Sequence, residues 1–229
     1  MERSSLKFTM NYILYLIFLS LIGIKAAYSQ DIVPNRTLQK SYSGVGIHGG
    51  IGFSNFSFHS TTTYKNHVLL FPSGIQGRFF LKERWALLSS IDYLSLGASE
   101  KGLDIENSYR LRSLQLSSSA EYFFSRNTAK PIISLQGGLF VGKILEPILF
   151  YHTVQSNSTG QSRPIDTFID WNVGATLGIA ISKNIYKSHS ISVSYRYDVG
   201  LLNIATKTTD PGTRYLTRAN HLSLSYSFH

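Results

Sequence analysis

Apolar and polar residues alternate along most of the chain beyond residue 44, with the two-residue period of a β-strand that has one apolar and one polar face. The last stretch alternates serine with four apolar residues, Leu222, Leu224, Tyr226 and Phe228. A long apolar strand at the end of a chain invites aggregation unless both of its edges are paired. Closing a sheet into a barrel supplies the second partner. We therefore expect these residues to form the strand that closes a barrel.

Seven further stretches show the same alternation. They are Val45–Phe53, Gly74–Leu81, Trp85–Leu96, Tyr109–Phe124, Ile133–Gly142, Ile169–Ile181 and Ser190–Gly200. In the fourth of them, Leu111 and Leu114 fall on opposite faces, which predicts a bulge or a phase change near Arg112 and Ser113. Together with the last strand, these stretches predict eight strands of about ten residues each.

The connections between the predicted strands alternate between short and long. The short connections are residues 82–84, 125–130 and 182–188, and the long ones are residues 54–72, 97–108, 144–167 and 201–217. This alternation predicts an up-and-down meander with both chain ends on the side of the short turns. Short periplasmic turns and longer external loops are typical of barrels in the bacterial outer membrane.

The two faces of the strands decide between a membrane barrel and a soluble one. A soluble eight-stranded barrel such as a lipocalin is apolar inside and polar outside. Here the polar faces carry charged residues among glycine and serine, which suit a narrow lumen, while branched and aromatic residues dominate the other faces. We expect an all-β fold, an eight-stranded antiparallel up-and-down transmembrane β-barrel of the small OmpA/OmpX type. The alternative is a secreted soluble β-barrel or sandwich.

Charged and amide side chains on the polar faces are the main candidate site. The predicted polar network of the lumen consists of His48, Gln76, Arg78, Asp92, Gln115, Glu121, Gln136, Asp170, Asn172, Arg196 and Asp198. Eight strands enclose a space that side chains fill, so an open diffusion pore is not expected. Because buried charges must be paired, we interpret the network as a structural plug rather than as a conducting or ligand-binding lumen.

The N-terminal residues have the composition of an export signal. Arg3 and Lys7 precede an apolar run at residues 12–24, and small residues at 27 and 29 mark a cleavage site. The run is shorter than the roughly 20 residues of a spanning helix, which is the alternative interpretation. We predict a signal peptide at residues 1–29, a short periplasmic segment at 30–43 and the barrel at 44–229. The absence of cysteine excludes disulfides, thiolate metal sites and a lipid-modified N-terminal cysteine.

The net charge narrows the choice of partners. Without the predicted signal peptide the chain keeps 19 of its 22 basic and 12 of its 13 acidic residues, a balance of +7. A basic balance can indicate nucleic acid, but the chain has no basic helix and no clustered basic run. We therefore expect contact with anionic groups of outer-membrane lipid and lipopolysaccharide, and no nucleic acid.

Two features invite other interpretations. His221 and Ser223 resemble the His-x-Ser of outer-membrane lipid A deacylases, in which an imidazole activates a hydroxyl nucleophile. With Leu222 on the lipid face, however, both side chains should point into the lumen, away from any acyl chain. No metal-ligand spacing and no phosphate-binding loop occurs in the sequence, so we expect no enzyme and no cofactor. The apolar segments 67–71 and 144–151 predict either a protruding hairpin that turns near residues 157–160 or a partner surface.

The eight-strand meander, the predicted signal peptide, the stretch Tyr195–Leu201 and the closing stretch Leu222–Phe228 resemble the small outer-membrane β-barrel proteins of the Bacteroidota, the PorT-like or porin-like family. The resemblance covers nearly all of the mature chain. It implies the outer membrane of a Gram-negative bacterium, insertion by the barrel-assembly machinery, and extracellular or secretion partners at the loops. In two places the chain departs from the family pattern, with a polar stretch at residues 114–119 and His229 after the final aromatic residue.

From these features we expect a non-enzymatic integral outer-membrane barrel with a structural, adhesive or envelope-interaction role. The alternatives are a small porin-like transport barrel or a PorT-like accessory of protein secretion, and, third, a lipid-modifying enzyme.

Overall fold

The computed structural model describes residues 44–58, 66–101, 105–125, 130–153, 158–162, 168–186, 188–204 and 215–228. The predicted signal peptide and periplasmic segment lie outside these ranges. The described residues form ten strands, and their pairings are all antiparallel. Within these ranges no helix is long and apolar enough to cross a membrane.

The strands follow the stretches in which apolar and polar residues alternate. They are β1 (Gly44–Phe58), β2 (Asn66–Leu70), β3 (Ser73–Lys82), β4 (Trp85–Lys101), β5 (Ile105–Phe123), β6 (Ile132–Thr153), β7 (Ser158–Ser162), β8 (Trp171–Tyr186), β9 (His189–Gly200) and β10 (Tyr215–Phe228).

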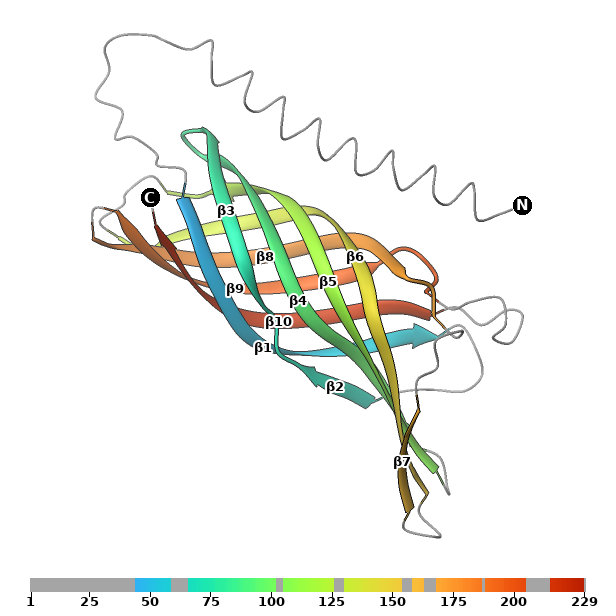
Figure 1. Ribbon diagram of the computed structural model, residues 1–229. Coiled ribbons are helices and arrows are strands. Elements are labelled where there is room, and N and C mark those ends of the chain that lie inside the picture. The colour runs from blue at the N-terminus through green and yellow to red at the C-terminus, as the bar shows by residue number, and fades with distance from the viewer. Residues whose placement is uncertain are drawn as a thin grey trace, which may run out of the picture. The chain divides into compact units, whose positions relative to one another are not determined.

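The sheet closes on itself as a barrel (Figure 1). Strand β10 pairs with β9 on one edge and with β1 on the other, from Val45 opposite Phe228 to Phe58 opposite Tyr215. The last strand therefore forms the closing seam, as the sequence predicts. At this seam a Cβ atom on Gly50 would collide with the backbone oxygen of Leu222, so the close approach of β1 and β10 requires glycine there.

Ten strands occupy eight positions in the barrel wall. Both β2 and β3 lie between β1 and β4, separated by Phe71 and Pro72, and β7 pairs only with β6 among the described strands. Proline has no N–H to donate to a neighbouring strand, which explains the interruption. The Pro72 carbonyl still accepts a hydrogen bond from Gly50 N at 2.9 Å. The predicted all-β up-and-down meander is confirmed, with ten described strands in place of the predicted eight.

Several strands are longer than the predicted ten residues, because they continue into stretches that the sequence analysis assigned to connections. Strand β4 reaches Lys101, β5 begins at Ile105, and β6 continues to Thr153. Strand β7 pairs with the end of β6, from Leu149 opposite Ser162 to Thr153 opposite Ser158. The apolar segment 144–151 is thus part of a hairpin that protrudes beyond the barrel wall (Figure 1). Residues 158–160 of the predicted turn belong to β7, and residue 157 lies outside the described residues.

The predicted irregularity near Arg112 is present, but it lies on the neighbouring strand. Arg112 pairs with Glu146 and Ser113 with Ile144, so Leu145 of β6 is the extra residue of a bulge. Strand β5 itself alternates without interruption, so of the two predicted alternatives, a bulge or a phase change, the bulge is the one present. Leu111 is buried inside the barrel at 0% exposure, whereas Leu114 lies on the outer wall at 47%.

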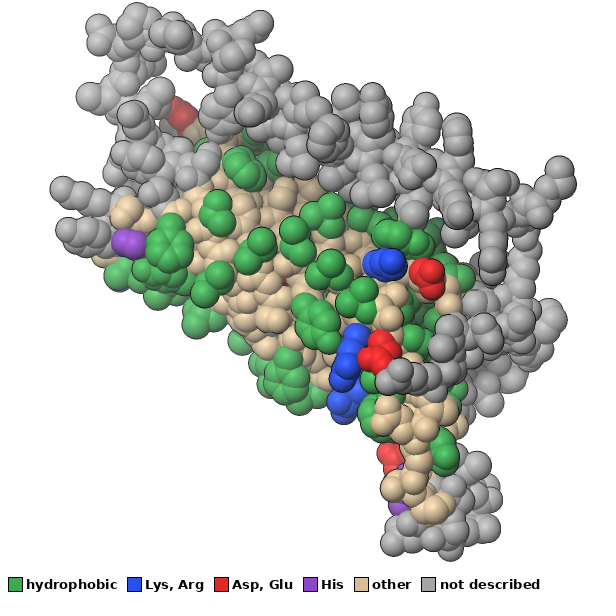
Figure 2. Space-filling model, viewed as in Figure 1, with side chains coloured by type: hydrophobic (Ala, Val, Ile, Leu, Met, Phe, Trp, Pro, Cys, Tyr) green, Lys and Arg blue, Asp and Glu red, His purple; other side chains and the backbone are tan. Residues whose placement is uncertain are grey.

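Apolar side chains cover the outer wall, as predicted (Figure 2). They include Val45, Ile47, Ile51, Ile75, Ile91, Leu114, Leu135, Leu139, Leu177, Ile179, Val193, Leu222 and Leu224. The buried positions of the same strands carry mainly serine, amide and charged side chains. This arrangement inverts that of a soluble barrel and suits a wall surrounded by lipid.

One part of the interior was not predicted. Near the long connections, buried apolar side chains form a core cluster of Phe56, Leu70, Leu94, Leu96, Ala98, Leu111, Ile144, Phe168, Ile204 and Ala219. Phe168 lies among the aromatic members, with ring centroids 6.1 Å from Phe56, 5.8 Å from Tyr109 and 6.1 Å from Tyr215. The interior is therefore polar in one half of the barrel and apolar in the other.

Candidate functional site

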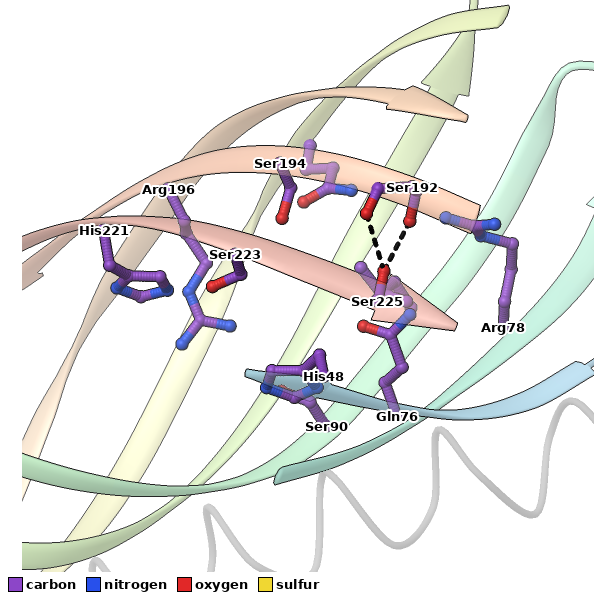
Figure 3. Close-up of a pocket in the computed structure, with 12 residues that line it drawn as sticks. His48, Gln76, Arg78, Ser90, Ser192, Ser194, Arg196, His221, Ser223 and Ser225 are labelled. Carbon is purple, nitrogen blue, oxygen red and sulfur yellow. Dashed lines mark hydrogen bonds between the residues drawn. The ribbon is translucent and has the colours of Figure 1, made fainter. Parts of the chain in front are cut away.

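The polar half of the interior brings together side chains from strands that are far apart in the sequence. Their inward direction follows from the strand pleat, which sends alternate residues to the same face. Figure 3 shows His48, Arg196, His221 and Ser223 directed into this space from three strands. We describe two groups, the Asp92 cluster (His48, Ser90, Asp92, Gln115, Arg196, Asp198) and the Glu121 cluster (Arg78, Glu121, Ser134, Gln136).

In the Asp92 cluster one guanidinium joins two carboxylates. Arg196 Nη2 lies 3.0 Å from Asp92 Oδ2, and Arg196 Nε lies 3.2 Å from Asp198 Oδ1. The other oxygen of Asp92 lies 2.5 Å from His48 Nε2. Ser90 Oγ donates to Asp92 at 2.7 Å, and Gln115 Nε2 donates to Asp198 at 3.2 Å.

The positions of the strands in the sheet show which of these contacts cross the lumen. Strands β4 and β9, which carry Asp92 and Arg196, are not neighbours in the sheet, since β5, β6 and β8 separate them on one side. The pair Asp92–Arg196 therefore crosses the lumen. The bond from Gln115 on β5 to Asp198 on β9 does the same.

In the Glu121 cluster one carboxylate accepts four hydrogen bonds. Arg78 Nε and Nη2 donate to the two oxygens of Glu121 at 2.8 and 3.2 Å. Ser134 Oγ and Gln136 Nε2 donate to Oε1 at 2.7 and 3.2 Å. The two-pronged arginine contact is the strong geometry for such a pair.

Two aromatic rings close the lumen beside the Glu121 cluster. The Phe123 ring lies 5.7 Å from the guanidinium carbon of Arg78 and stacks on Phe80 at 5.3 Å. Both rings are near the short turns. The polar interior thus ends in an aromatic layer on this side and in the core cluster on the other.

The remaining predicted residues have different positions. Asn172 is buried and donates to Thr217 Oγ1 at 2.9 Å, outside both clusters. Gln76 is half-buried, and its Nε2 donates to Ser227 Oγ over a long 3.5 Å. The prediction for Asp170 was wrong, because β8 begins at Trp171 and the alternation of the pleat does not extend to Asp170. Its side chain is exposed, and its carbonyl accepts from Ile144 N at 2.7 Å.

Burial makes the pairing of these charges essential. Asp92 and Glu121 are 0% exposed, and Arg78 is 5% exposed. An ionised group in such surroundings is costly unless its partners satisfy it, and loss of one partner destabilises by about 3–5 kcal/mol. The clusters are therefore arrangements in which each member depends on the others.

Sequence reasoning placed serine on the inner faces but gave it no part in the network. Ser192 and Ser225 lie 2.5 Å apart on neighbouring strands, and Ser90 contacts Ser117 at 2.7 Å. The signal was present in the sequence as serine at alternate positions of β9 and β10. Serine hydroxyls form hydrogen bonds between neighbouring strands, and these short side chains occupy little of the lumen.

His221 and Ser223 point into the lumen and not toward lipid, and both are buried. Ser223 Oγ has no hydrogen-bond partner in the described part of the chain, so no imidazole activates it there. The cavity that these two residues help to line measures about 20 Å³, enough for about one water molecule. Within the described ranges no group of three or more acidic or histidine side chains is placed to hold a metal ion.

The four residues of the predicted closing signal lie on the other face of β10. Leu222, Leu224 and Phe228 are 51%, 58% and 52% exposed on the outer wall. Tyr226 is half-buried, and its hydroxyl lies 2.8 Å from His189 Nδ1.

Comparison with known proteins gives relatives in structure only. No curated protein matches the sequence. Neisserial surface protein A is similar at 12% identity over 82% of this chain and 99% of its own, with a TM-score of 0.42. The outer membrane protein OprG from Pseudomonas aeruginosa is similar at 12% identity over 82% and 96%, with a TM-score of 0.41. The attachment invasion locus protein Ail of Yersinia pestis is similar at 11% over 81% and 97%, with a TM-score of 0.37.

The family comparison covers most of the barrel. A model described as an outer membrane protein beta-barrel domain matches residues 28–206. This match agrees with the closed antiparallel sheet and its apolar outer wall. The chain belongs to the outer membrane protein beta-barrel domain family, whose place is the outer membrane of Gram-negative bacteria.

Proposed function

We propose that this protein is a non-conducting, non-enzymatic barrel whose role in the outer membrane is structural or adhesive, through contacts of its loop end with the envelope or its surroundings. The observation that carries the proposal is the Asp92–Arg196 pair, which joins opposite walls of the lumen at 3.0 Å. A solute would have to break this pair in order to pass.

The absence of enzymatic function rests on the chemistry of the lumen. A nucleophile needs a base within hydrogen-bond reach and space for a substrate. Ser223 has no such partner among the described residues, and the cavity beside it measures about 20 Å³. The buried carboxylates of Asp92, Glu121 and Asp198 are held in ion pairs.

The hairpin of β6 and β7 supports an interaction role. It carries Phe150 and Tyr151 beyond the barrel wall, 38% and 39% exposed. The guanidinium of Arg110 lies 5.6 Å from the centre of the Phe150 ring and holds it in place. Aromatic side chains presented on a rigid hairpin supply contact area at a low cost in conformational entropy.

The proposal includes a route to the membrane and partners there. The sequence supports a cleaved signal peptide, a PorT-like relationship within the Bacteroidota, and use of Leu222, Leu224, Tyr226 and Phe228 by the barrel-assembly machinery. Exposed basic residues at the short turns, Lys82, Arg84, Lys130 and Lys183, suit phosphates of the inner leaflet. Lipopolysaccharide is the corresponding partner in the outer leaflet.

Single-channel recording in planar lipid bilayers tests the closed lumen. Purified protein is expected to give no discrete conductance steps. The double variant Asp92→Ala/Arg196→Ala removes the cross-lumen pair and is expected to give steps. The matched variant Arg112→Ala/Glu146→Ala removes a pair of equal length, 3.0 Å, on the outer wall and is expected to remain silent. Reproducible steps from the unaltered protein would overturn the proposal.

Mass spectrometry of lipid A from cells with and without the gene tests the enzymatic alternative. Identical spectra are expected. A change in acyl chains or phosphates that depends on the gene would establish a lipid-modifying activity instead.

A further inference from the structure

Among the described residues, the barrel wall has a break beside β6. Pairing between β6 and β8 ends at Lys143 opposite Trp171, followed by a single backbone bond from Ile144 N to the Asp170 carbonyl at 2.7 Å. Pairing between β6 and β7 begins only at Leu149. Residues 145–148 of β6 therefore face no described strand on this side. The bulge at Leu145 lies at the same place.

A cavity of about 440 Å³ occupies the break. Its apolar lining comes from Ile144, Leu145, Phe168 and Ile169, and two acidic residues, Glu146 and Asp170, complete it. Ile144 and Phe168 are each 6% exposed and belong to the core cluster inside the barrel, whereas Leu145 is 54% exposed on the outer wall. The cavity thus lies between the apolar interior and the outer surface.

Backbone hydrogen bonds and ring packing hold the lining of the cavity in place. Besides the bond between Ile144 and Asp170, Ile169 N donates to the Ile204 carbonyl at 2.8 Å. Phe168 packs among the aromatic rings of the core cluster. Ligand sites are usually formed in advance in this way, apolar with a few polar groups, and of about 300–1,000 Å³.

The level of the cavity indicates from where a ligand would come. Lys143 and Arg112, both exposed, and the half-buried Trp171 lie beside it, at the edge of the apolar outer wall. Tryptophan and basic residues collect at the boundary between lipid and water. Small apolar molecules concentrate in that boundary layer and would meet the break directly.

We propose that this break is a binding site for a small uncharged aromatic or apolar molecule that enters from the outer boundary of the membrane. The volume and lining select the apolar body, because an anion such as a phosphate or sulfonate group would lose its hydration among these apolar side chains. Arg112 Nη1 donates to Glu146 Oε2 at 3.0 Å. The cavity shares no lining residue with the Asp92 cluster or the Glu121 cluster, so the site is independent of the role proposed above.

Fluorescence titration of the barrel in lipid nanodiscs tests the site. The variant Trp85→Phe leaves Trp171, which adjoins Asp170, as the single tryptophan of the chain's two. N-phenyl-1-naphthylamine is an uncharged acceptor for tryptophan emission, and 1-anilinonaphthalene-8-sulfonate is its anionic counterpart. We expect saturable energy transfer from Trp171 to the uncharged probe above the linear lipid background, and affinity about tenfold or more weaker for the anionic one.

A filled variant and a matched control locate the binding. Leu145→Phe with Ile169→Phe places two rings in the cavity and is expected to weaken binding about tenfold or more. Leu139→Phe makes the same change on the outer wall of β6, away from the cavity, at a side chain 63% exposed, and should leave binding unchanged.

No saturable transfer in the Trp85→Phe protein would overturn the inference, as would equal affinity for the two probes. Equal binding by the filled variant and the control would also overturn it. If the filled variant does not fold, as judged by its electrophoretic mobility before and after heating, the comparison of the two probes decides. Conductance is not affected by any of these outcomes, so failure here is distinct from failure of the closed lumen.

Discussion

The two halves of the barrel interior are built in opposite ways. Near the short turns the inside is polar and the outside apolar, as with Gln115 buried and Leu114 exposed on β5. Near the long connections the same strand has Leu111 buried and Arg110 and Arg112 exposed. On the two sides of Ser113 the inner and outer faces of β5 therefore have opposite polarity, although inward and outward residues keep alternating through this position. A strand keeps the inverted arrangement only where lipid surrounds it, and beyond that level it is arranged like a soluble protein.

Two other strands show the same exchange of polarity. Lys143 on β6 and Arg218 on β10 are exposed, and the residues that follow them, Ile144 and Ala219, belong to the core cluster. The level at which the polarity changes thus marks the outer boundary of the membrane on the barrel wall. It also explains why the interior is closed by ion pairs in one half and by apolar packing in the other.

The largest expected effect comes from the ion pairs of the polar half. Arg196→Met leaves Asp92 and Asp198 buried without their shared cation and is expected to lower the free energy of unfolding by about 3–5 kcal/mol. Urea unfolding in lipid vesicles, followed by tryptophan fluorescence, measures this. Arg112→Met is the matched control, since Arg112 pairs with Glu146 at 3.0 Å but is 51% exposed. Its expected loss is about 1 kcal/mol or less, and equal losses would contradict the difference between the two sites.

The apolar half is expected to behave like a packed core. Leu111→Ala removes a side chain with 0% exposure and should lower the free energy of unfolding by about 2–5 kcal/mol, because a cavity remains. Leu114→Ala, at 47% exposure on the outer wall, leaves a space that lipid chains fill and should cost less. The same urea titration compares them. A larger loss for Leu114→Ala would show that the core cluster is not tightly packed.

A charge on the outer wall should reveal the membrane boundary. Leu139→Arg lies within the apolar wall and is expected to destabilise by about 2–4 kcal/mol, whereas Leu145→Arg, beyond Lys143 on the same strand, should cost about 0–1 kcal/mol. Both side chains are exposed, at 63% and 54%. Refolding yields into vesicles and urea midpoints measure the difference. Equal destabilisation by the two variants would show that the membrane boundary does not lie at the level where the polarity of β5 changes.

The fold was predictable because its main signal is local. Alternation along each strand, clearest in β9 and β10, indicates which residues share a face, and the charged residues on the apolar strands identify the inner face. Closure through β10 followed from the apolar end of the chain. The pairing of Asp92 with Arg196 was not predictable, because alternation gives the face of a residue but neither its depth in the barrel nor the strand opposite.

The errors have a common cause in the ends of strands. Asp170 was assigned to the lumen because the predicted strand began at Ile169, two residues before β8 begins at Trp171. The core cluster was missed because Phe56, Leu70 and Ile204 lie in stretches assigned to connections. Leu111 and Leu114 were interpreted as a bulge or a phase change within β5, since the sequence does not show where the strand leaves the membrane.

Thiol labelling tests the central claim, a closed polar interior within an apolar wall, most directly. The chain has no cysteine of its own, so Ser192→Cys, Leu139→Cys and Glu83→Cys each introduce a single reporter, in the lumen, on the outer wall and in a short turn. We expect a charged, water-soluble maleimide to label only Glu83→Cys, and a lipid-soluble maleimide to label Leu139→Cys as well. Labelling of Ser192→Cys by the water-soluble reagent as fast as Glu83→Cys would contradict the account.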